Sequence, residues 1–310
     1  MQPFHAHART RNIVAYSDMR AAREQEEKAC SCSIAEHECT QGGRGKMKKA
    51  GEIRMVAADL DGTLLRKDKR ISDYTDEVIR RLRADGVIFV VATARPVRAV
   101  KEFLPWLQYD AGIFHNGAVV YDAGERVGGV GVKNAGELAG RVLTDRPDCH
   151  AAVEADDVLY ANFDAERIWP GAVYVRTEDF SMLRGRSADK MIFEACSVEE
   201  LEEFRHYLPE ELYIQLSENR IAMVMNRKAT KTEGLRLLSA RHGFSLREVA
   251  AFGDDYNDSE MLRECGTGIA VANALEEVRA AADGVCGSNE EDGVARWLEE
   301  NLLSGWGGAE

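Results

Sequence analysis

The segment Ile53-Arg-Met-Val-Ala-Ala-Asp-Leu-Asp-Gly-Thr-Leu-Leu65 joins an apolar run to two closely spaced carboxylates. The run from Ile53 to Ala58 predicts a short buried strand, because five of its six residues are apolar. Asp59-Leu-Asp61-Gly-Thr63 follows directly and predicts a turn at the end of that strand. Ligands of open parallel sheets bind beyond the carboxyl ends of the strands, so this turn is the first candidate for a reactive site.

The next segments of the chain continue a strand–helix rhythm. A helix is expected over 72–85, since Ser72 can cap it and apolar residues follow at helical spacing. The apolar run 87–92 is typical of a strand that is covered on both faces. A second helix over 97–107 and a third strand over 111–114 follow. This alternation predicts an α/β fold with a Rossmann-like parallel sheet and right-handed crossovers.

The rhythm is interrupted in the middle of the chain. After a hairpin signal at Tyr121-Asp-Ala-Gly-Glu125, the strands alternate or break, and polar helices separate them. The βα rhythm returns in the last third of the chain, with helices expected over 230–242, 257–265 and 275–282 and strands over 248–252 and 268–271. We therefore expect a discontinuous core of 51–133 and 217–310, with an inserted α+β domain at 134–216.

The length and net charge of the chain disfavour some classes of function. The chain has 310 residues, which is enough for two hydrophobic cores, and its formal net charge is −13. Residues 51–310 hold 31 Lys and Arg against 47 Asp and Glu, so this acidic body disfavours binding to nucleic acid or to an anionic membrane. No apolar run approaches the ~20 residues that cross a bilayer. Seven cysteines, an odd count, favour free thiols in a reducing cytoplasm.

We expect residues 1–50 to form a disordered extension rather than part of the fold. They lack the apolar stretch of a secretory signal, and Met47 is an alternative start because a strand follows soon after it. Cys30, Cys32 and Cys39, with His37, could be interpreted as a metal cluster. Their spacing matches no zinc site, so we expect an exposed tail.

Asp59 and Asp61 are the strongest candidates for chemistry. The alternative is that they have only a structural role, in an Asx turn that caps the segment. As catalytic groups, Asp59 would attack phosphorus, while Asp61 would protonate the leaving oxygen and later activate water. Carboxylates this close together also attract a divalent cation, and hard oxygen ligands suit Mg²⁺.

Three further clusters stand at strand ends or helix starts. Thr93 follows the second strand and could hold a phosphoryl oxygen, or could simply cap a helix. Lys231 opens a helix and could bind phosphate; a solvent-facing lysine is the alternative, and Lys228 is its rival for the role. Gly253-Asp254-Asp255-Tyr-Asn257-Asp258 could be a capped loop, or could complete a Mg²⁺ site with Asp59.

Together, and in this order, the four clusters resemble the motifs of the haloacid dehalogenase superfamily. The resemblance is to its Cof-type phosphatases, subclass IIB, which carry a large α+β cap of the C2 type, and it covers about 53–300. The matching segments are Asp59-Leu-Asp-Gly-Thr-Leu-Leu65, Val91-Ala-Thr-Ala-Arg-Pro96, Phe114-His-Asn-Gly-Ala118 with Tyr121-Asp122, Lys231 with Leu235, and Gly253-Asp-Asp-Tyr-Asn-Asp-Ser-Glu-Met-Leu262.

The resemblance implies a role for each matching residue. Asp59 would be the nucleophile and a Mg²⁺ ligand, and Asp61 the general acid/base that lends its backbone carbonyl to the metal. Thr93 and Lys231 would hold the phosphoryl group. Ala94, where the family commonly has Gly, would present a backbone N–H to the phosphoryl group. Asp254 would be a carboxylate ligand of Mg²⁺, and Asn257 would contact phosphate. Asp258 would support Lys231 or a metal-bound water.

The residue at Asp61 separates the branches of the superfamily. The P-type ATPases have Lys there and the dehalogenases have no acid, so Asp61 favours phosphoryl transfer from an ester oxygen. We expect a cytoplasmic, Mg²⁺-dependent phosphatase of small phosphorylated metabolites, such as sugar phosphates, with no nucleic-acid or membrane partner and no oligomeric state specified. A phosphomutase, a sugar-phosphate-specific enzyme and a non-catalytic binding protein are the alternatives. The cap would select the substrate, with Arg184 and Arg186 either binding a second anionic group or lying in a solvated loop.

Overall fold

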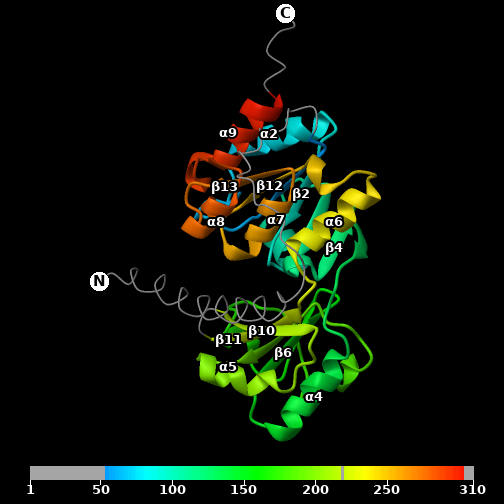
Figure 1. The fold of residues 1–310 in the computed structure, drawn as a ribbon. Helices are drawn as coiled ribbons and strands as arrows, with labels where there is room; N and C mark the ends of the chain where they lie inside the picture. The colour runs from blue at the N-terminus through cyan, green and yellow to red at the C-terminus, as the bar shows by residue number, and fades with distance from the viewer. Residues whose placement is uncertain (1–52, 218–219, 304–310) are drawn as a thin grey trace, which may run out of the picture.

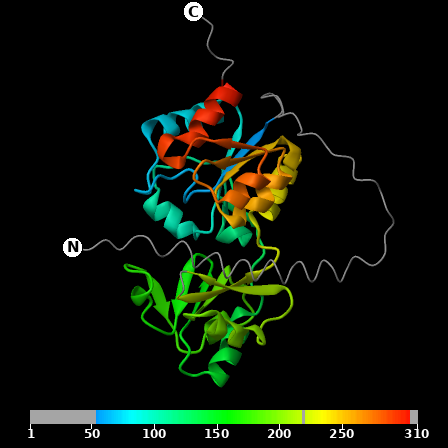
Figure 2. The same ribbon diagram turned by 60° about the vertical axis from the view of Figure 1, so that its left-hand side comes forward.

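The computed structural model describes residues 53–217 and 220–303, and their strands form two sheets. The two sheets lie one above the other along the long axis of the molecule (Figures 1 and 2). The tail of residues 1–50, for which we expected exposure rather than a metal cluster at His37, lies outside the described residues. Among the described residues, the four cysteines are free, and none of the helices is long and apolar enough to cross a membrane.

The larger sheet has eight strands in the order β14-β13-β12-β1-β2-β3-β4-β5. Its first six strands are parallel, and β4 and β5 extend it as an antiparallel hairpin. The expected α/β fold is confirmed. The strands are β1 (Met55–Ala58), β2 (Ile88–Ala92), β3 (Ala111–Phe114), β4 (Val119–Asp122), β5 (Glu125–Gly128), β12 (Val249–Gly253), β13 (Thr267–Val271) and β14 (Gly284–Cys286).

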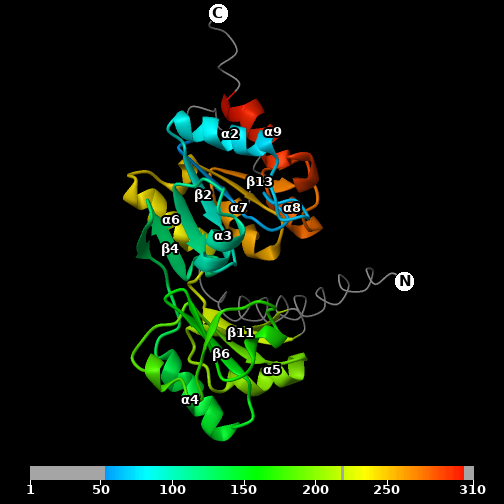
Figure 3. The ribbon, with the colours of Figure 1, turned by 180° about the vertical axis from the view of Figure 1, so that it is seen from behind.

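Helices cover both faces of this sheet. Figure 1 shows α6 and α7 in front of it, and Figure 3, from behind, shows α2 and α3. All residues of β1 are fully buried between these layers, as the unbroken apolar run requires. The helices are α2 (Asp73–Ala84), α3 (Val97–Phe103), α6 (Lys231–Arg241), α7 (Ser259–Glu264), α8 (Glu276–Ala281) and α9 (Gly293–Leu298), with a π-helical turn η8 (Glu299–Leu303) after α9.

Two helix ends differ from the sequence prediction for local reasons. We expected a helix over 97–107, but α3 ends at Phe103 because Leu104 precedes Pro105, which disfavours the helical conformation. The helix expected over 257–265 begins as the 3₁₀ turn η6 (Tyr256–Asp258). The other 3₁₀ turns are η2 (His115–Gly117), η3 (Ala165–Arg167), η4 (Ser181–Leu183), η5 (Leu246–Glu248) and η7 (Asn289–Glu291).

The smaller sheet has six strands in the order β10-β11-β9-β6-β7-β8. It includes β11, so the boundary that we expected at 216/217 falls inside this sheet; β11 pairs with β10 and β9 there because the chain turns back after Ser217. We propose an inserted cap domain that extends to about 226. Its elements are α4 (Ala135–Asp145), β6 (Ala151–Ala155), β7 (Val158–Ala161), β8 (Tyr174–Arg176), β9 (Lys190–Glu194), α5 (Val198–Arg205), β10 (Leu212–Ser217) and β11 (Ile221–Asn226).

Candidate active site

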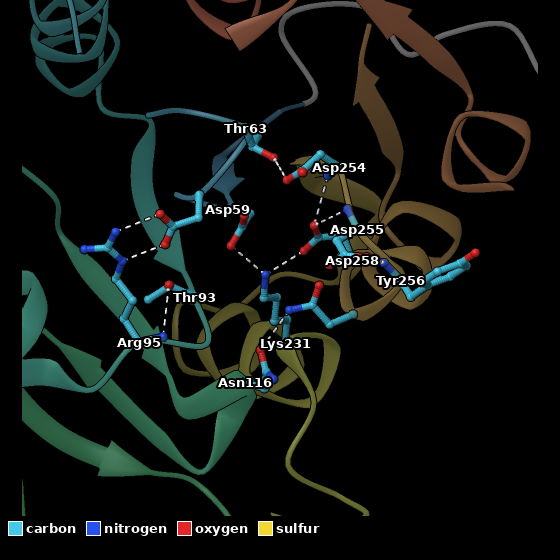
Figure 4. Close-up of polar contacts among 12 residues, drawn as sticks. Asp59, Thr63, Thr93, Arg95, Asn116, Lys231, Asp254, Asp255, Tyr256 and Asp258 are labelled. Atoms are coloured by element: carbon cyan, nitrogen blue, oxygen red, sulfur yellow. Dashed lines mark hydrogen bonds and ion pairs between the residues drawn. The ribbon is translucent and has the colours of Figure 1, made fainter. Parts of the chain in front are cut away.

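The candidate site lies at the carboxyl ends of three neighbouring strands of the larger sheet. Asp59 follows β1, Thr93 follows β2, and Asp254 follows β12, and these strands are adjacent in the order β12-β1-β2. Parallel strands place all their carboxyl ends at one edge, so residues that are far apart in the sequence come together there. Figure 4 shows these side chains converging from separate segments of the chain.

Lys231, the first residue of α6, lies at the centre of the site. Its side chain is fully buried, and its Nζ donates to Asp59 Oδ1 at 2.7 Å and to Asp258 Oδ1 at 2.6 Å (Figure 4). Burial disfavours the charged amine, but the negative charges of Asp258 and Asp59 outweigh it and raise the pKa of Lys231 above its ordinary value. Lys228 is exposed. Of the two lysines considered, Lys231 is therefore the one beside the carboxylates.

Asp59 and Asp254 carry unfavourable charge in the absence of a cation. Burial, reinforced by the charges of Asp258 and Asp254, raises the pKa of Asp59 well above its ordinary value, although Lys231 opposes this. Burial also raises the pKa of Asp254 to about 6, against a hydrogen bond from Thr63 Oγ1 at 2.7 Å. The ionised forms of both groups would be stabilised by added positive charge.

The donor set fits a hard divalent cation. One carboxylate oxygen from each of Asp59, Asp254 and Asp258 lies within 4.8 Å of the others. Gly62 makes room for this cluster: its φ is +91°, and a Cβ there would lie 2.4 Å from Asp254 Oδ2. Clustered carboxylate oxygens, including those of Asp59 and Asp254 whose pKa values burial raises, are the environment that Mg²⁺ neutralises.

Asp258 is a structural support within this cluster. It is fully buried, its Oδ1 accepts from Lys231, and its Oδ2 accepts from the backbone N–H groups of Asp254 at 3.0 Å and of Asp255 at 3.2 Å. The geometry matches the expected support of Lys231. With its oxygens already engaged, Asp258 is a poorer direct metal ligand than Asp59 or Asp254.

Asp61 faces a different environment from Asp59. Arg95 donates to it through two nitrogens, Nε to Oδ2 at 2.6 Å and Nη2 to Oδ1 at 2.7 Å, and Lys69 Nζ donates to Oδ1 at 2.7 Å. Burial alone would raise the pKa of Asp61, but the hydrogen bonds from Arg95 and Lys69 lower it below its ordinary value. The Asp61 side chain lies outside the three-carboxylate group, so a metal contact through its backbone carbonyl stays a prediction.

The sequence interpretation did not assign roles to Arg95 and Lys69. Arg95 stood inside a quoted motif, two residues after Thr93, and that position at the same strand end was the available signal. Lys69 had no such signal, because a turn with a φ of +64° brings it back over Asp61. The contacts of both cations with Asp61 depend on how the turn after β1 and the loop after β2 fold together.

The remaining predicted residues lie around the site without touching the carboxylates. Thr93 is buried, and its hydroxyl accepts from the Arg95 backbone N–H at 3.2 Å; Ala94 beside it is exposed. Asn257 is exposed and donates to Asn116 Oδ1 at 3.1 Å. These phosphate-contact roles stay predictions.

Arg184 and Arg186, which we considered for a second anionic group, are exposed residues of the smaller sheet's connections. Arg186 pairs with Asp156 in the β6–β7 turn. Its positive charge is therefore already balanced, which favours the solvated-loop alternative for this residue.

Comparisons with known proteins agree with this geometry. A family model described as haloacid dehalogenase-like hydrolase matches residues 56–298. The chain is 28% identical over 262 residues to the 5-amino-6-(5-phospho-D-ribitylamino)uracil phosphatase YitU of Bacillus subtilis, covering 79% of this chain and 96% of that one. It is 26% identical over 269 residues to the pyridoxal phosphate phosphatase YbhA of Escherichia coli, covering 81% and 99%. The solved structure of the subclass IIB sugar phosphatase BT4131 has the same fold, with a TM-score of 0.66, 24% identity, and 80% and 98% coverage.

Proposed function

The chain belongs to the haloacid dehalogenase-like hydrolases, as a Cof-type hydrolase of phosphate esters, and from this premise we propose that it is a subclass IIB enzyme and how it works. We propose a Mg²⁺-dependent phosphomonoesterase that acts on small phosphorylated metabolites through an aspartyl-phosphate on Asp59. A cytoplasmic location and the absence of nucleic-acid and membrane partners stay predictions.

One observation carries the proposal. Asp59 and Asp61 stand two residues apart in one turn, yet Asp59 is buried against Lys231, whereas Asp61 is held by Arg95 and Lys69. Their pKa values move in opposite directions, up for Asp59 and down for Asp61. A nucleophile must be ionised, so Asp59 in this role needs the charge of Lys231 and of a bound cation, whereas Asp61 lies outside the carboxylate cluster and is free to exchange a proton.

The residues support a two-step displacement. Asp59 would attack phosphorus and form an aspartyl-phosphate, while the leaving oxygen takes a proton from Asp61. Asp61 would then accept a proton from the water that cleaves the aspartyl-phosphate. The Arg95 and Lys69 contacts favour the ionised form of Asp61, so the geometry described here suits the second step; donation in the first step requires Asp61 to have bound a proton.

Lys231 and neighbouring hydrogen-bond donors would bind the phosphoryl oxygens. Lys231 Nζ is already within hydrogen-bond distance of the attacking carboxylate and would also meet the phosphoryl oxygens. The Thr93 hydroxyl and the Ala94 backbone N–H would complete the cradle, with Asn257 at its rim. Asp59 and Asp254 would hold Mg²⁺, which supplies further neutralising charge when bound.

The substrate is proposed from the named activities of the relatives. Their named substrates, 5-amino-6-(5-phospho-D-ribitylamino)uracil and pyridoxal phosphate, are both phosphate monoesters of small polar metabolites. We propose the same class for this chain. A panel of these two compounds, sugar phosphates and p-nitrophenyl phosphate would rank the members of that class.

Phosphate release with Mg²⁺ and with EDTA tests the proposal, using wild type, Asp59→Asn and the matched control Asp255→Asn. Asp255 is an exposed carboxylate of the same site that caps η6, a task that asparagine also performs. We expect Mg²⁺-dependent release that is lost in Asp59→Asn and kept in Asp255→Asn. Equal activity of Asp59→Asn and wild type would remove Asp59 from the nucleophile role, and phosphate moved to another position of a sugar would indicate a mutase.

A further inference from the structure

The turn between β6 and β7 reaches from the smaller sheet to the first turn of α3 in the larger domain. The turn consists of Asp156 and Asp157, and α3 begins at Val97, directly after the loop that holds Thr93 and Arg95. Figure 3 shows α3 on the side of the core that faces the smaller sheet. The contact therefore joins the proposed cap to the segment that carries two residues of the candidate site.

Asp157 supplies the cap that α3 lacks. The residue before the helix, Pro96, makes no side-chain cap hydrogen bond. Asp157 Oδ1 instead accepts from the backbone N–H of Arg98 at 2.7 Å. The second amide of a helix is one that an ordinary N-cap side chain satisfies, so a residue 59 positions away performs a task that is normally local.

The Arg98 side chain makes a second link at the same place. It pairs with Glu154 of β6 and lies 3.8 Å from Asp157. Glu154 is 4% exposed, and Lys190 of β9 lies 3.0 Å from its other oxygen. Because Lys190 belongs to the same sheet, Glu154 keeps a charged partner when Arg98 is absent. The link is therefore separable from the folding of the smaller sheet.

Further polar contacts between the core and the proposed cap lie around this link. Arg126 of β5 lies 3.0 Å from Asp189 and 3.6 Å from Asp156, and His115 Nε2 lies 4.0 Å from Glu154. Asp189 adjoins Ala188, which pairs with Val132 in the connection between the sheets. These contacts hold the base of the smaller sheet. His115 also meets the catalytic loop, because its backbone N–H donates to Arg95 O at 3.1 Å, whereas Arg98 connects the β6–β7 turn to the helix that continues that loop.

We propose that Arg98 and Asp157 are positioning residues that fix the orientation of the smaller sheet over the phosphoryl site. This inference rests on the proposed function, because it assigns the leaving-group end of the substrate to the smaller sheet. Neither residue touches the reacting atoms. They act by tying the β6–β7 turn to the helix that continues the Thr93–Arg95 loop, so that a surface on one sheet is held in register with nucleophile and phosphate ligands on the other.

The expected consequence depends on the size of the leaving group. A metabolite whose leaving group contacts the smaller sheet should lose binding and alignment when the link is cut. p-Nitrophenyl phosphate has an activated leaving group and draws little on the cap. We therefore expect a loss that is selective for the larger substrate, which a general loss of folding would not produce.

Two replacements at Asp157 isolate the cap hydrogen bond. The turn has positive φ at both residues, 51° at Asp156 and 63° at Asp157, which is the two-residue hairpin in which Asp-Gly is favoured. Asp157→Gly therefore keeps the turn and removes the acceptor, whereas Asp157→Asn keeps an acceptor oxygen. Arg98→Ala and Arg98→Lys form the corresponding pair on α3. Arg176→Ala, at an exposed arginine that pairs only locally with Glu178, is the matched control.

The experiment has one arm that needs no substrate. Hydrogen exchange of the α3 amides should speed up at least about tenfold in Asp157→Gly, and remain near wild type in Asp157→Asn and Arg176→Ala. In the kinetic arm, Asp157→Gly and Arg98→Ala should lower kcat/KM about tenfold or more for the best metabolite of the panel, mainly through KM, and change kcat/KM for p-nitrophenyl phosphate less than about twofold. Asp157→Asn and Arg98→Lys should recover part of the loss.

Each outcome bears on the inference separately from the proposed function. Unchanged exchange in Asp157→Gly would overturn the link whatever the enzyme does. Faster exchange with equal kinetic losses on both substrates would overturn the positioning role and leave a structural one. A wild type that releases no phosphate from any ester would refute the proposed function and with it the positioning role, while the exchange result would still establish or refute the contact.

Discussion

Replacing Lys231 by methionine tests the electrostatic core of the candidate site. Methionine approximates the length of the lysine stem but carries no charge, so the substitution removes the cation and leaves the packing nearly intact. Lys231 is fully buried and makes two charge-assisted hydrogen bonds, at 2.7 Å to Asp59 and 2.6 Å to Asp258. In Lys231→Met these two carboxylates and Asp254 would face one another without a counter-charge.

The loss of stability follows from the geometry. Removing one partner of a buried ion pair costs about 3–5 kcal/mol, because the remaining charge keeps its desolvation penalty. We therefore expect Lys231→Met to lower the free energy of unfolding by about 3–5 kcal/mol at pH 7.5 in EDTA. Mg²⁺ or a fall in pH to 5.5 should recover part of it, since each neutralises carboxylate charge that has lost its lysine partner.

The wild type should show no such pH response from Lys231 itself. The pKa of this lysine is raised in the folded state, so its stabilisation is complete below the ordinary lysine pKa and is lost only above it. Acidification from pH 7.5 to 5.5 therefore leaves the Lys231 contribution constant in wild type. Protonation of Asp59 and Asp254, whose pKa values are raised, also stabilises the wild type in EDTA over this window, so we expect Lys231→Met to show a larger gain than wild type.

The assay is urea unfolding at pH 7.5 and 5.5, with EDTA and with Mg²⁺. Lys228→Met is the control, because Lys228 is an exposed lysine in the turn that precedes α6. We expect Lys228→Met to lie within about 0.5 kcal/mol of wild type. Equal stabilities for the two variants, with no recovery by Mg²⁺ or acid, would refute the reasoning that Lys231 neutralises the buried carboxylates.

Three further predictions follow from single residues. Asp59→Asn should abolish phosphate release yet raise the melting temperature in EDTA, because the raised pKa of Asp59 means that its ionised form opposes folding at neutral pH; a lower melting temperature would contradict this. Gly62→Ala should cost more stability than Gly86→Ala and should weaken Mg²⁺ binding in a titration. Both glycines have positive φ, but a new Cβ at Gly62 would lie 2.4 Å from Asp254, whereas a Cβ at Gly86 would contact nothing. Equal losses of stability in the two variants would count against the clash. His115→Asn should reduce the loss of stability between pH 6 and 4 by about 2 kcal/mol, measured by urea unfolding. Burial lowers the pKa of His115 to about 3, so the unfolded chain binds a proton in this window that the folded chain does not; an unchanged pH slope would show that His115 does not titrate this way.

The local pattern of the chain was enough to predict most strands of the larger sheet and the residue types at their carboxyl ends. Apolar runs such as 53–58 and 87–92 predicted buried parallel strands, because a strand covered on both faces has no polar side. Once these strands were assigned to one sheet, Asp59, Thr93 and Asp254 had to meet at its carboxyl edge. Their convergence is thus a consequence of topology that the sequence order already contained.

The sequence could not predict contacts that depend on the path of the chain between elements. The boundary at 216/217 was wrong because β11 completes a sheet whose other strands lie up to 70 residues earlier, and strand partners are not encoded within the strand itself. Arg95 and Lys69 meet Asp61 only because a turn and a loop bring three positions together. Contacts of this kind produce no periodic pattern in the sequence from which they could be predicted.

Short-range patterns in this chain therefore determined which residue types stand at the strand ends, and tertiary structure determined what each one faces. Asp59 and Asp61 are the same residue type, two positions apart, yet one is buried against Lys231 and the other is held by Arg95. A carboxylate's pKa depends on its desolvation and on the charges within a few ångströms, and both come from segments distant in the sequence. The same holds for Asp157, whose role as a cap for α3 exists only because two sheets lie together.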